Sequence, residues 1–139
     1  MYTLGMSTTY TTLLQDSYAL GETKDCSVRA LTVVSGRPYR EVHEVFRKCG
    51  RRHRRGTPRH VTQKAIAALG LYALDVSKQY KGRTVRTLER ELPAGKRFLV
   101  YTRRHMLGVR HGKVEDYTSG RLHRVEKIEE IVPRNPGAL

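Results

Sequence analysis

Three residues have the types and positions for nucleophilic catalysis: Cys26, His105 and Asp116. Cys26 is expected in the first turn of a helix, where free backbone N–H groups and the helix dipole favour a thiolate. A thiolate is the nucleophilic form of cysteine, an imidazole can move its proton, and a carboxylate can orient that imidazole. Together they could attack an acyl carbonyl. The alternative for Cys26 alone is a small buried side chain within a helix.

The positions of His105 and Asp116 predict that they share one face of a β-hairpin. Strand-like runs at 105–110 and 113–118 flank His111-Gly112, a pair suited to a two-residue turn. With that turn, Asp116 lies diagonally across from His105 at roughly 7–8 Å, within reach of a hydrogen bond. The remaining residues of this face are mostly apolar, so a histidine and a carboxylate on it need a specific reason.

The elements that must position these residues follow from apolar spacing and from capping residues. Asp25 and Thr57 are expected to act as N-caps, and Gly36, Gly50 and Gly70 end three of the helices. The predicted helices cover 12–19, 26–35, 38–49, 58–69 and 84–92. The predicted strands cover 98–101, 105–110, 113–118 and 122–125.

Helices followed by an antiparallel meander predict an α+β fold. We expect a single domain over residues 1–139. Its first part, 1–21, is predicted to be an irregular N-terminal arm that contains the helix at 12–19. Its last part, 133–139, is predicted to be a frayed tail.

The composition narrows the class of protein. The chain has 139 residues and a net charge of +14, with 27 Lys and Arg against 13 Asp and Glu. No apolar run reaches the length of a transmembrane helix, and the N-terminus lacks the pattern of a secretory signal, so we expect neither membrane association nor secretion through a signal peptide. Two cysteines cannot form a disulfide framework, which favours a reducing compartment.

The segment around Cys26 resembles a known family. Asp25-Cys26-x-x-Arg29-Ala-Leu, followed by Gly36-x-x-Tyr39-x-x-Val42, is similar to the opening of small phage and bacterial papain-like proteins related to bacteriocin leader peptidases. The resemblance spans about residues 22–120. It implies a papain-like fold, in which N-terminal helices, with the nucleophilic cysteine at the start of the first core helix, pack on a C-terminal antiparallel sheet.

The resemblance also implies roles: Cys26 as nucleophile, His105 as general base and acid, and Asp116 as the orienting acid. Papain-like enzymes commonly carry a glutamine about six residues before the cysteine, and this chain has Leu20 there. The roles of Cys26, His105 and Asp116 predict a thiol hydrolase, a peptidase or amidase acting on a peptide or protein. The absence of the glutamine keeps an alternative open, a catalytically inactive papain-like phage structural or accessory protein. In either case the resemblance implies a phage-encoded protein in the cytoplasm of a bacterial host or in the virion, with virion components as potential partners.

A basic segment, residues 47–60 (RKCGRRHRRGTPRH), holds seven Lys and Arg and no acidic residue. Its arginines could bind the phosphates of a nucleic acid or an acidic protein. No aromatic residue is interleaved, so base stacking is not indicated. The simpler interpretation is a solvated basic loop. The candidate binding residues are Arg51, Arg52, Arg54 and Arg55.

The remaining cysteine and histidines are assigned structural or surface positions. Cys49 lies on the apolar stripe of the predicted helix 38–49 and is expected in the core. Cys49 and His53 have a ligand-like spacing, but structural zinc needs four ligands and no matching pair follows. We therefore expect no metal and no cofactor. The histidines expected at the surface or in turns are His43, His53, His60, His111 and His123.

Overall fold

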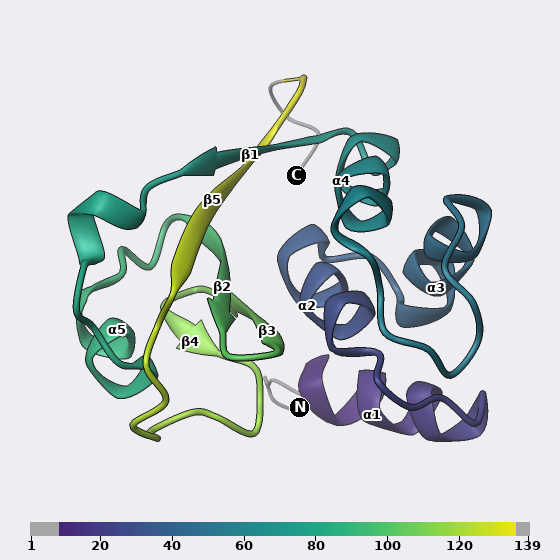
Figure 1. Ribbon diagram of the computed structural model, residues 1–139, viewed down its shortest axis with the longest axis horizontal. Coiled ribbons are helices and arrows are strands. Elements are labelled where there is room, and N and C mark those ends of the chain that lie inside the picture. Colours follow the sequence, from purple (N-terminus) through teal and green to yellow (C-terminus); the bar gives the residue numbers. More distant parts are fainter. Residues whose placement is uncertain (1–8, 136–139) are drawn as a thin grey trace, which may run out of the picture.

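A computed structural model of the protein describes residues 9–135, in which a five-stranded antiparallel sheet lies between two layers of helices (Figure 1). The helices are α1 (Thr9–Ala19), α2 (Cys26–Ser35), α3 (Tyr39–Lys48), α4 (Arg59–Ala68), the 3-10 helix η2 (Ser77–Tyr80) and α5 (Val85–Glu91). The strands are β1 (Leu71–Asp75), β2 (Arg97–Thr102), β3 (His105–Arg110), β4 (Lys113–Val114) and β5 (Lys127–Pro133). Their order in the sheet is β1-β5-β2-β3-β4. The predicted α+β class is confirmed.

The larger core lies between the sheet and helices α1 to α4, with α2 closest to the sheet. Gly108 of β3 permits this approach, because a Cβ at that position would lie 2.8 Å from the Ala30 carbonyl oxygen and 2.8 Å from the Val33 Cβ. Real Cβ atoms do not come so close to other atoms. The helix that begins with Cys26 is therefore packed directly on the strand that begins with His105.

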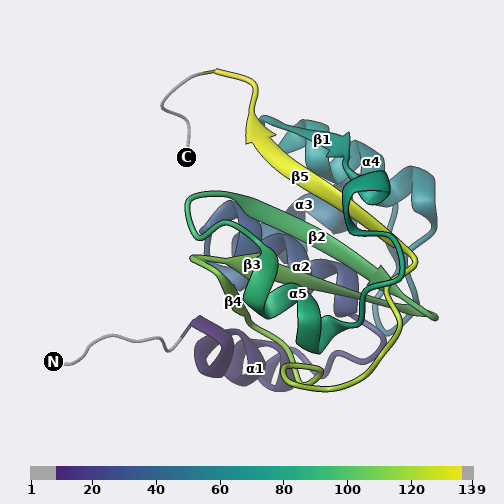
Figure 2. The ribbon, with the colours of Figure 1, turned by 90° about the vertical axis from the view of Figure 1, so that its left-hand side faces the viewer.

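The smaller core covers the other face of the sheet, where α5 packs (Figure 2). Thr84 caps α5 in a capping box with Thr87, which satisfies the first free N–H groups of this short helix. Leu88 of α5 and Leu107 of β3 are buried in this core. The sheet is thus covered on both faces, and its two core faces alternate along β3.

Most of the predicted helices agree with the structure, and the differences lie at their ends. The predicted helix at 12–19 is α1, which begins earlier, at Thr9, and buries Leu13 against α2 and α3, so much of the predicted irregular arm is a packed helix. Residues 1–8 and 136–139 of the predicted arm and tail lie outside the described residues. The predicted tail begins inside β5, which ends at Pro133. Within 9–135, every helix falls short of the length and apolar character needed to cross a membrane.

The capping hydrogen bonds predicted for Asp25 and Thr57 do not form. Asp25 does precede α2, but its side chain makes no capping hydrogen bond, and α4 likewise begins without one. The Thr57 hydroxyl instead accepts a 2.6 Å hydrogen bond from the hydroxyl of Ser27. Each of these side chains bonds to a partner in another part of the chain, which local capping rules do not consider.

The hairpin prediction was correct at the turn and wrong further out. Val109 pairs with Val114 as expected, but β4 ends at Val114 rather than continuing to 118. The predicted strand at 122–125 was also wrong: at Arg124 there is an isolated bridge to Thr84. Two strands, β1 and β5, were not predicted; they pair with each other, and β5 also pairs with β2.

Candidate active site

Asp116 and His105 form a direct hydrogen bond. The distance from the Asp116 carboxylate to Nε2 of His105 is 2.9 Å. The same carboxylate oxygen accepts bonds from the backbone N–H and the hydroxyl of Thr118, at 3.1 and 2.6 Å. Asp116 and Thr118 are buried, so the carboxylate is held in one orientation. The predicted contact therefore exists, although the strand expected to carry Asp116 has already ended.

Cys26 lies close to the same imidazole, and both residues line one cleft. Hydrogen bonding to His105 and the positive charge of His105 both lower the pKa of the Cys26 thiol. Because Nε2 is bonded to Asp116, Nδ1 is the nitrogen left to face the thiol. The three residues predicted from the sequence thus lie in the order thiol, imidazole, carboxylate.

The electrostatics of this group favour charge separation. Burial raises the pKa of the Cys26 thiol, but the hydrogen bond with His105, the backbone N–H of Met106 and the charge of His105 outweigh burial and bring the pKa below its usual value. Burial lowers the pKa of His105, whereas Asp116 and Cys26 outweigh that effect and raise the pKa of His105 to about 9. Both shifts act in the direction that favours a thiolate beside an imidazolium.

The start of α2 adds to this effect. Cys26 is its first residue, where backbone N–H groups have no partner within the helix and the dipole favours an anion. The neighbouring Asp25 carboxylate was expected to turn toward the backbone; it turns into the protein instead. It accepts 2.7 Å hydrogen bonds from the hydroxyls of Ser17 and Tyr39, and Nε of Arg29 lies 3.1 Å away. Its charge is thus compensated by groups other than the thiol.

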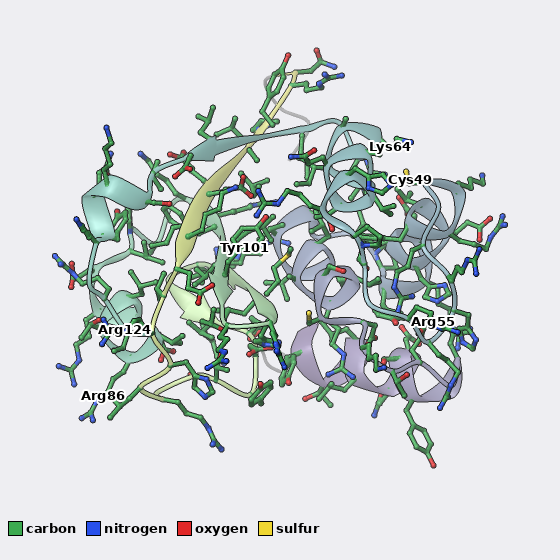
Figure 3. All side chains as sticks on the ribbon, in the orientation of Figure 1. Cys49, Arg55, Lys64, Arg86, Tyr101 and Arg124 are labelled. Carbon is green, nitrogen blue, oxygen red and sulfur yellow. The ribbon has the colours of Figure 1, made fainter. Side chains whose placement is uncertain are left out.

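A cleft of about 1300 Å³ opens at this group, between helices α2 and α4 and the sheet. Tyr101 lies in the middle of the molecule, between the sheet and the helices (Figure 3), and its hydroxyl donates a 2.5 Å hydrogen bond to Glu129 of β5. The cleft therefore gives a substrate access to Cys26 and His105. Residues that line it include Cys26, Thr57, Arg59, Tyr101, Arg104 and His105.

Leu20, the residue at the position of the papain-like glutamine, packs against the larger core. Its carbonyl oxygen accepts a 2.8 Å hydrogen bond from Nε2 of His53. The Leu20 side chain carries no hydrogen-bond donor. Thr118, whose hydroxyl donates to Asp116, was not predicted as a site residue. The Asp-x-Thr pattern, which favours such a local hydrogen bond, is the signal that could have found it.

A second polar group, the Glu22 cluster (Glu22, His43 and Arg51), lies in the helical layer and corrects two predictions. Arg51 donates bonds of 2.8 and 3.0 Å to the two carboxylate oxygens of Glu22, and its side chain is only 2% exposed. Arg51 is therefore a structural residue and is unavailable to a nucleic acid or a partner. His43, expected at the surface, has Nε2 2.6 Å from Glu22.

The other candidate binding arginines differ among themselves. Arg54 donates from its backbone to Glu22 and from its side chain to the Gly21 carbonyl oxygen. Arg52 and Arg55 are exposed, and among residues 9–135 neither forms an ion pair with a carboxylate. Cys49 is partly buried against the larger core, where it was expected. The part of the chain that the structure describes contains no cluster of three potential metal ligands.

Searches with this chain against models of protein families, against curated proteins and against solved structures gave no match. The interpretation of the site therefore depends on its own geometry.

Proposed function

We propose that this protein is a thiol hydrolase, a peptidase or amidase of papain-like type, with Cys26 as nucleophile, His105 as general base and acid, and Asp116 as the orienting acid. The observation that carries the proposal is the position of the His105 imidazole. It lies between a helix-start thiol and a buried carboxylate, at a cleft large enough for a peptide.

The proposed reaction proceeds in two steps. In the first, the Cys26 thiolate attacks the carbonyl carbon of an amide, the C–N bond breaks, and the His105 imidazolium gives its proton to the leaving amine. In the second, water attacks the thioester carbonyl carbon while His105 removes a proton from the water, and the C–S bond breaks. The products are a carboxylic acid and an amine, and the thiolate–imidazolium pair is restored. Asp116 keeps Nε2 of His105 bonded throughout, so that Nδ1 faces the reacting atoms.

The test is hydrolysis of a complex peptide mixture. We expect the purified protein to generate new N-termini in a proteome-derived peptide library, detected by mass spectrometry, and Cys26→Ala to abolish them. Cys49→Ala is the matched control, because it removes a thiol outside the cleft and should leave cleavage unchanged. Equal cleavage by Cys26→Ala, or none by any form of the protein, would contradict the proposal.

A second candidate function is binding of a nucleic acid or an acidic partner by an inactive papain-like protein. It is favoured by the exposed Arg52 and Arg55 and by the net charge of +14. Binding of a DNA duplex should then weaken steeply with salt, and Arg52→Gln with Arg55→Gln should flatten that dependence. An unchanged salt dependence would exclude these two residues from such binding.

A further inference from the structure

We propose that the cleft recognises an acidic peptide, with Lys24 and Arg104 binding its carboxylates on either side of the Cys26–His105 pair. This inference rests on the proposed hydrolase function and names its substrate class. Lys24 comes two residues before Cys26, and Arg104 comes directly before His105. Both basic side chains line the cleft.

The backbone at both residues is strained. Lys24 has φ of 54° and Arg104 has φ of 57°, a region that residues other than glycine seldom adopt. Such strain is concentrated at functional sites. Within residues 9–135 four non-glycine residues have positive φ, and two of them, Lys24 and Arg104, line the cleft close in sequence to Cys26 and His105.

Neither cation has a counter-charge in the structure. Among residues 9–135 no carboxylate lies within 4 Å of the charged group of Lys24 or Arg104, although Arg29 and Arg51 are both paired. Both residues are exposed to the solvent of the cleft. Their charges are therefore available to a ligand.

The other charged residues that line the cleft are also mostly basic. Arg59 of α4 is close enough to Tyr101 for its positive charge to oppose the burial-driven rise in the pKa of that phenol. Of the two glutamates in the lining, Glu129 is already occupied, by the Tyr101 hydroxyl at 2.5 Å and by Lys127 at 3.3 Å. The other glutamate, Glu126, is exposed and forms no ion pair within residues 9–135. The basic residues of the lining outnumber the two glutamates, so the net charge of the cleft wall favours an acidic ligand.

The lining favours a peptide over a nucleic acid. Apolar side chains such as Ile66, Leu71 and Met106 share the cleft with the cations and suit the methylene groups of a peptide. The exposed aromatic ring in the lining, Tyr72, has the Arg134 guanidinium 4.8 Å from its centre, so it is not free to stack on a base. Cations beside an apolar surface match acidic side chains on a peptide backbone.

The first experiment compares two alkylating reagents of nearly equal size at Cys26, anionic iodoacetate and neutral iodoacetamide. Both form an S–C bond and release iodide, so no hydrolysis is needed. We expect the ratio of the iodoacetate rate to the iodoacetamide rate to fall about fivefold in the double variant Lys24→Gln/Arg104→Gln, the effect of roughly 1 kcal/mol of attraction. The His105 charge is present in both proteins and cancels from this comparison.

The matched control is the double variant Lys64→Gln/Arg103→Gln. Lys64 lies on α4 at the outer side of the helical layer (Figure 3), and Arg103 is the neighbour of Arg104 in the same turn; both are exposed and outside the cleft lining. This control variant removes the same net charge and should leave the ratio of the iodoacetate rate to the iodoacetamide rate unchanged. An equal fall in both double variants would show a general charge effect and overturn the proposal.

The second experiment uses two decapeptide mixtures that differ only in having Glu or Gln at fixed positions. The Glu mixture should be cleaved faster and should slow iodoacetamide labelling of Cys26, and both advantages should disappear in Lys24→Gln/Arg104→Gln. Equal cleavage of both mixtures would overturn the acidic preference while the hydrolase stands. Protection by the Glu mixture without any cleavage would support the acidic site while the hydrolase falls. Better protection by a single-stranded oligonucleotide of equal charge would overturn the peptide assignment.

Discussion

Within residues 9–135, two hydrogen bonds between a carboxylate and an imidazole have different surroundings. In one, Glu22 lies 2.6 Å from Nε2 of His43; in the other, Asp116 lies 2.9 Å from Nε2 of His105. The two distances alone would not distinguish a structural pair from a catalytic one. The third group in each site does distinguish them, because Arg51 joins the first pair and Cys26 joins the second.

The two sites also differ in which group carries the charge. Burial raises the pKa of Glu22, but Arg51, His43 and the backbone N–H of Arg54 outweigh it and bring that pKa to about 2. Glu22 is thus a fixed anion that joins the segment before α2 to α3 and to the basic segment. At the other site the imidazole pKa is raised to about 9 by a carboxylate and a thiol, so a proton is held where it can be transferred. The two sites also differ in their access to a ligand, because His105 lines the cleft.

The largest expected effect separates the two histidines. At pH 6 an ordinary thiol with a pKa near 8.5 is about 0.3% thiolate, whereas an ion-paired one is mostly thiolate. His105→Ala should therefore slow iodoacetamide labelling of Cys26 about 100-fold at pH 6, and His43→Ala should leave it unchanged. Mass spectrometry of both cysteines measures this, with Cys49 as the internal standard. Equal rates in the two variants would remove His105 from the site.

The second prediction separates the two carboxylates by stability. Glu22→Gln leaves the buried Arg51 guanidinium without its counter-charge and should cost about 3–5 kcal/mol of unfolding free energy. Asp116→Asn keeps an oxygen that can accept the Thr118 bonds and should cost about 1–2 kcal/mol. Urea unfolding at pH 7 measures both. A larger loss in Asp116→Asn would reverse the structural and catalytic assignments.

Acid titration should sharpen the same contrast. Because the pKa of Glu22 is lowered from 4.5 to about 2 in the folded protein, its contribution to stability is fully present above pH 4.5 and is lost as the pH falls toward 2. That contribution is on the order of 3 kcal/mol. Unfolding free energy measured between pH 6 and pH 2 should fall more steeply in the unmodified protein than in Glu22→Gln. The exposed Glu41→Gln is the control, and a Glu22→Gln curve parallel to that control would contradict the assignment.

The smallest expected effect concerns the packing that brings Cys26 to His105. A methyl group at Gly108 would collide with the Ala30 carbonyl and with Val33, so Gly108→Ala should cost about 1–3 kcal/mol and slow Cys26 labelling at pH 6. Gly95→Ala is the matched control, because no atom lies within 4 Å of a Cβ built there. The Glu22 cluster does not depend on this contact. Full labelling in Gly108→Ala would show that the site tolerates movement of α2 on β3.

The parts of the fold predicted well from sequence are those set by near neighbours. Helices with clear apolar spacing and the His111-Gly112 turn appear where expected. Strand β5 was missed because Glu129 and Glu130 interrupt its apolar pattern. Their partners, Tyr101 and Lys96, come from elsewhere in the chain, so the compensation that lets these glutamates occupy an inner strand is not visible locally.

The basic segment shows the same limit. Its arginines look alike in the sequence, yet Arg51 is buried and Arg52 beside it is exposed. The difference comes from Glu22, a carboxylate 29 residues earlier that accepts the Arg51 guanidinium in a buried position. A run of like charges therefore indicates a basic surface only after its internal partners have been identified.

The sequence by itself determined the α+β class, the helix start at Cys26 and the His111-Gly112 turn that brings Asp116 near His105, because each depends on residues close together in the chain. Only the tertiary structure decided that the thiol meets the imidazole, that Glu22 and His43 form a structural pair with Arg51, and that Lys24 and Arg104 meet at one cleft. The first and last of these relations require α2 to pack on β3 across a gap of about eighty residues, and the Glu22 cluster joins residues up to 29 positions apart. The energy of such long-range packing depends on shape and burial, which no local pattern encodes.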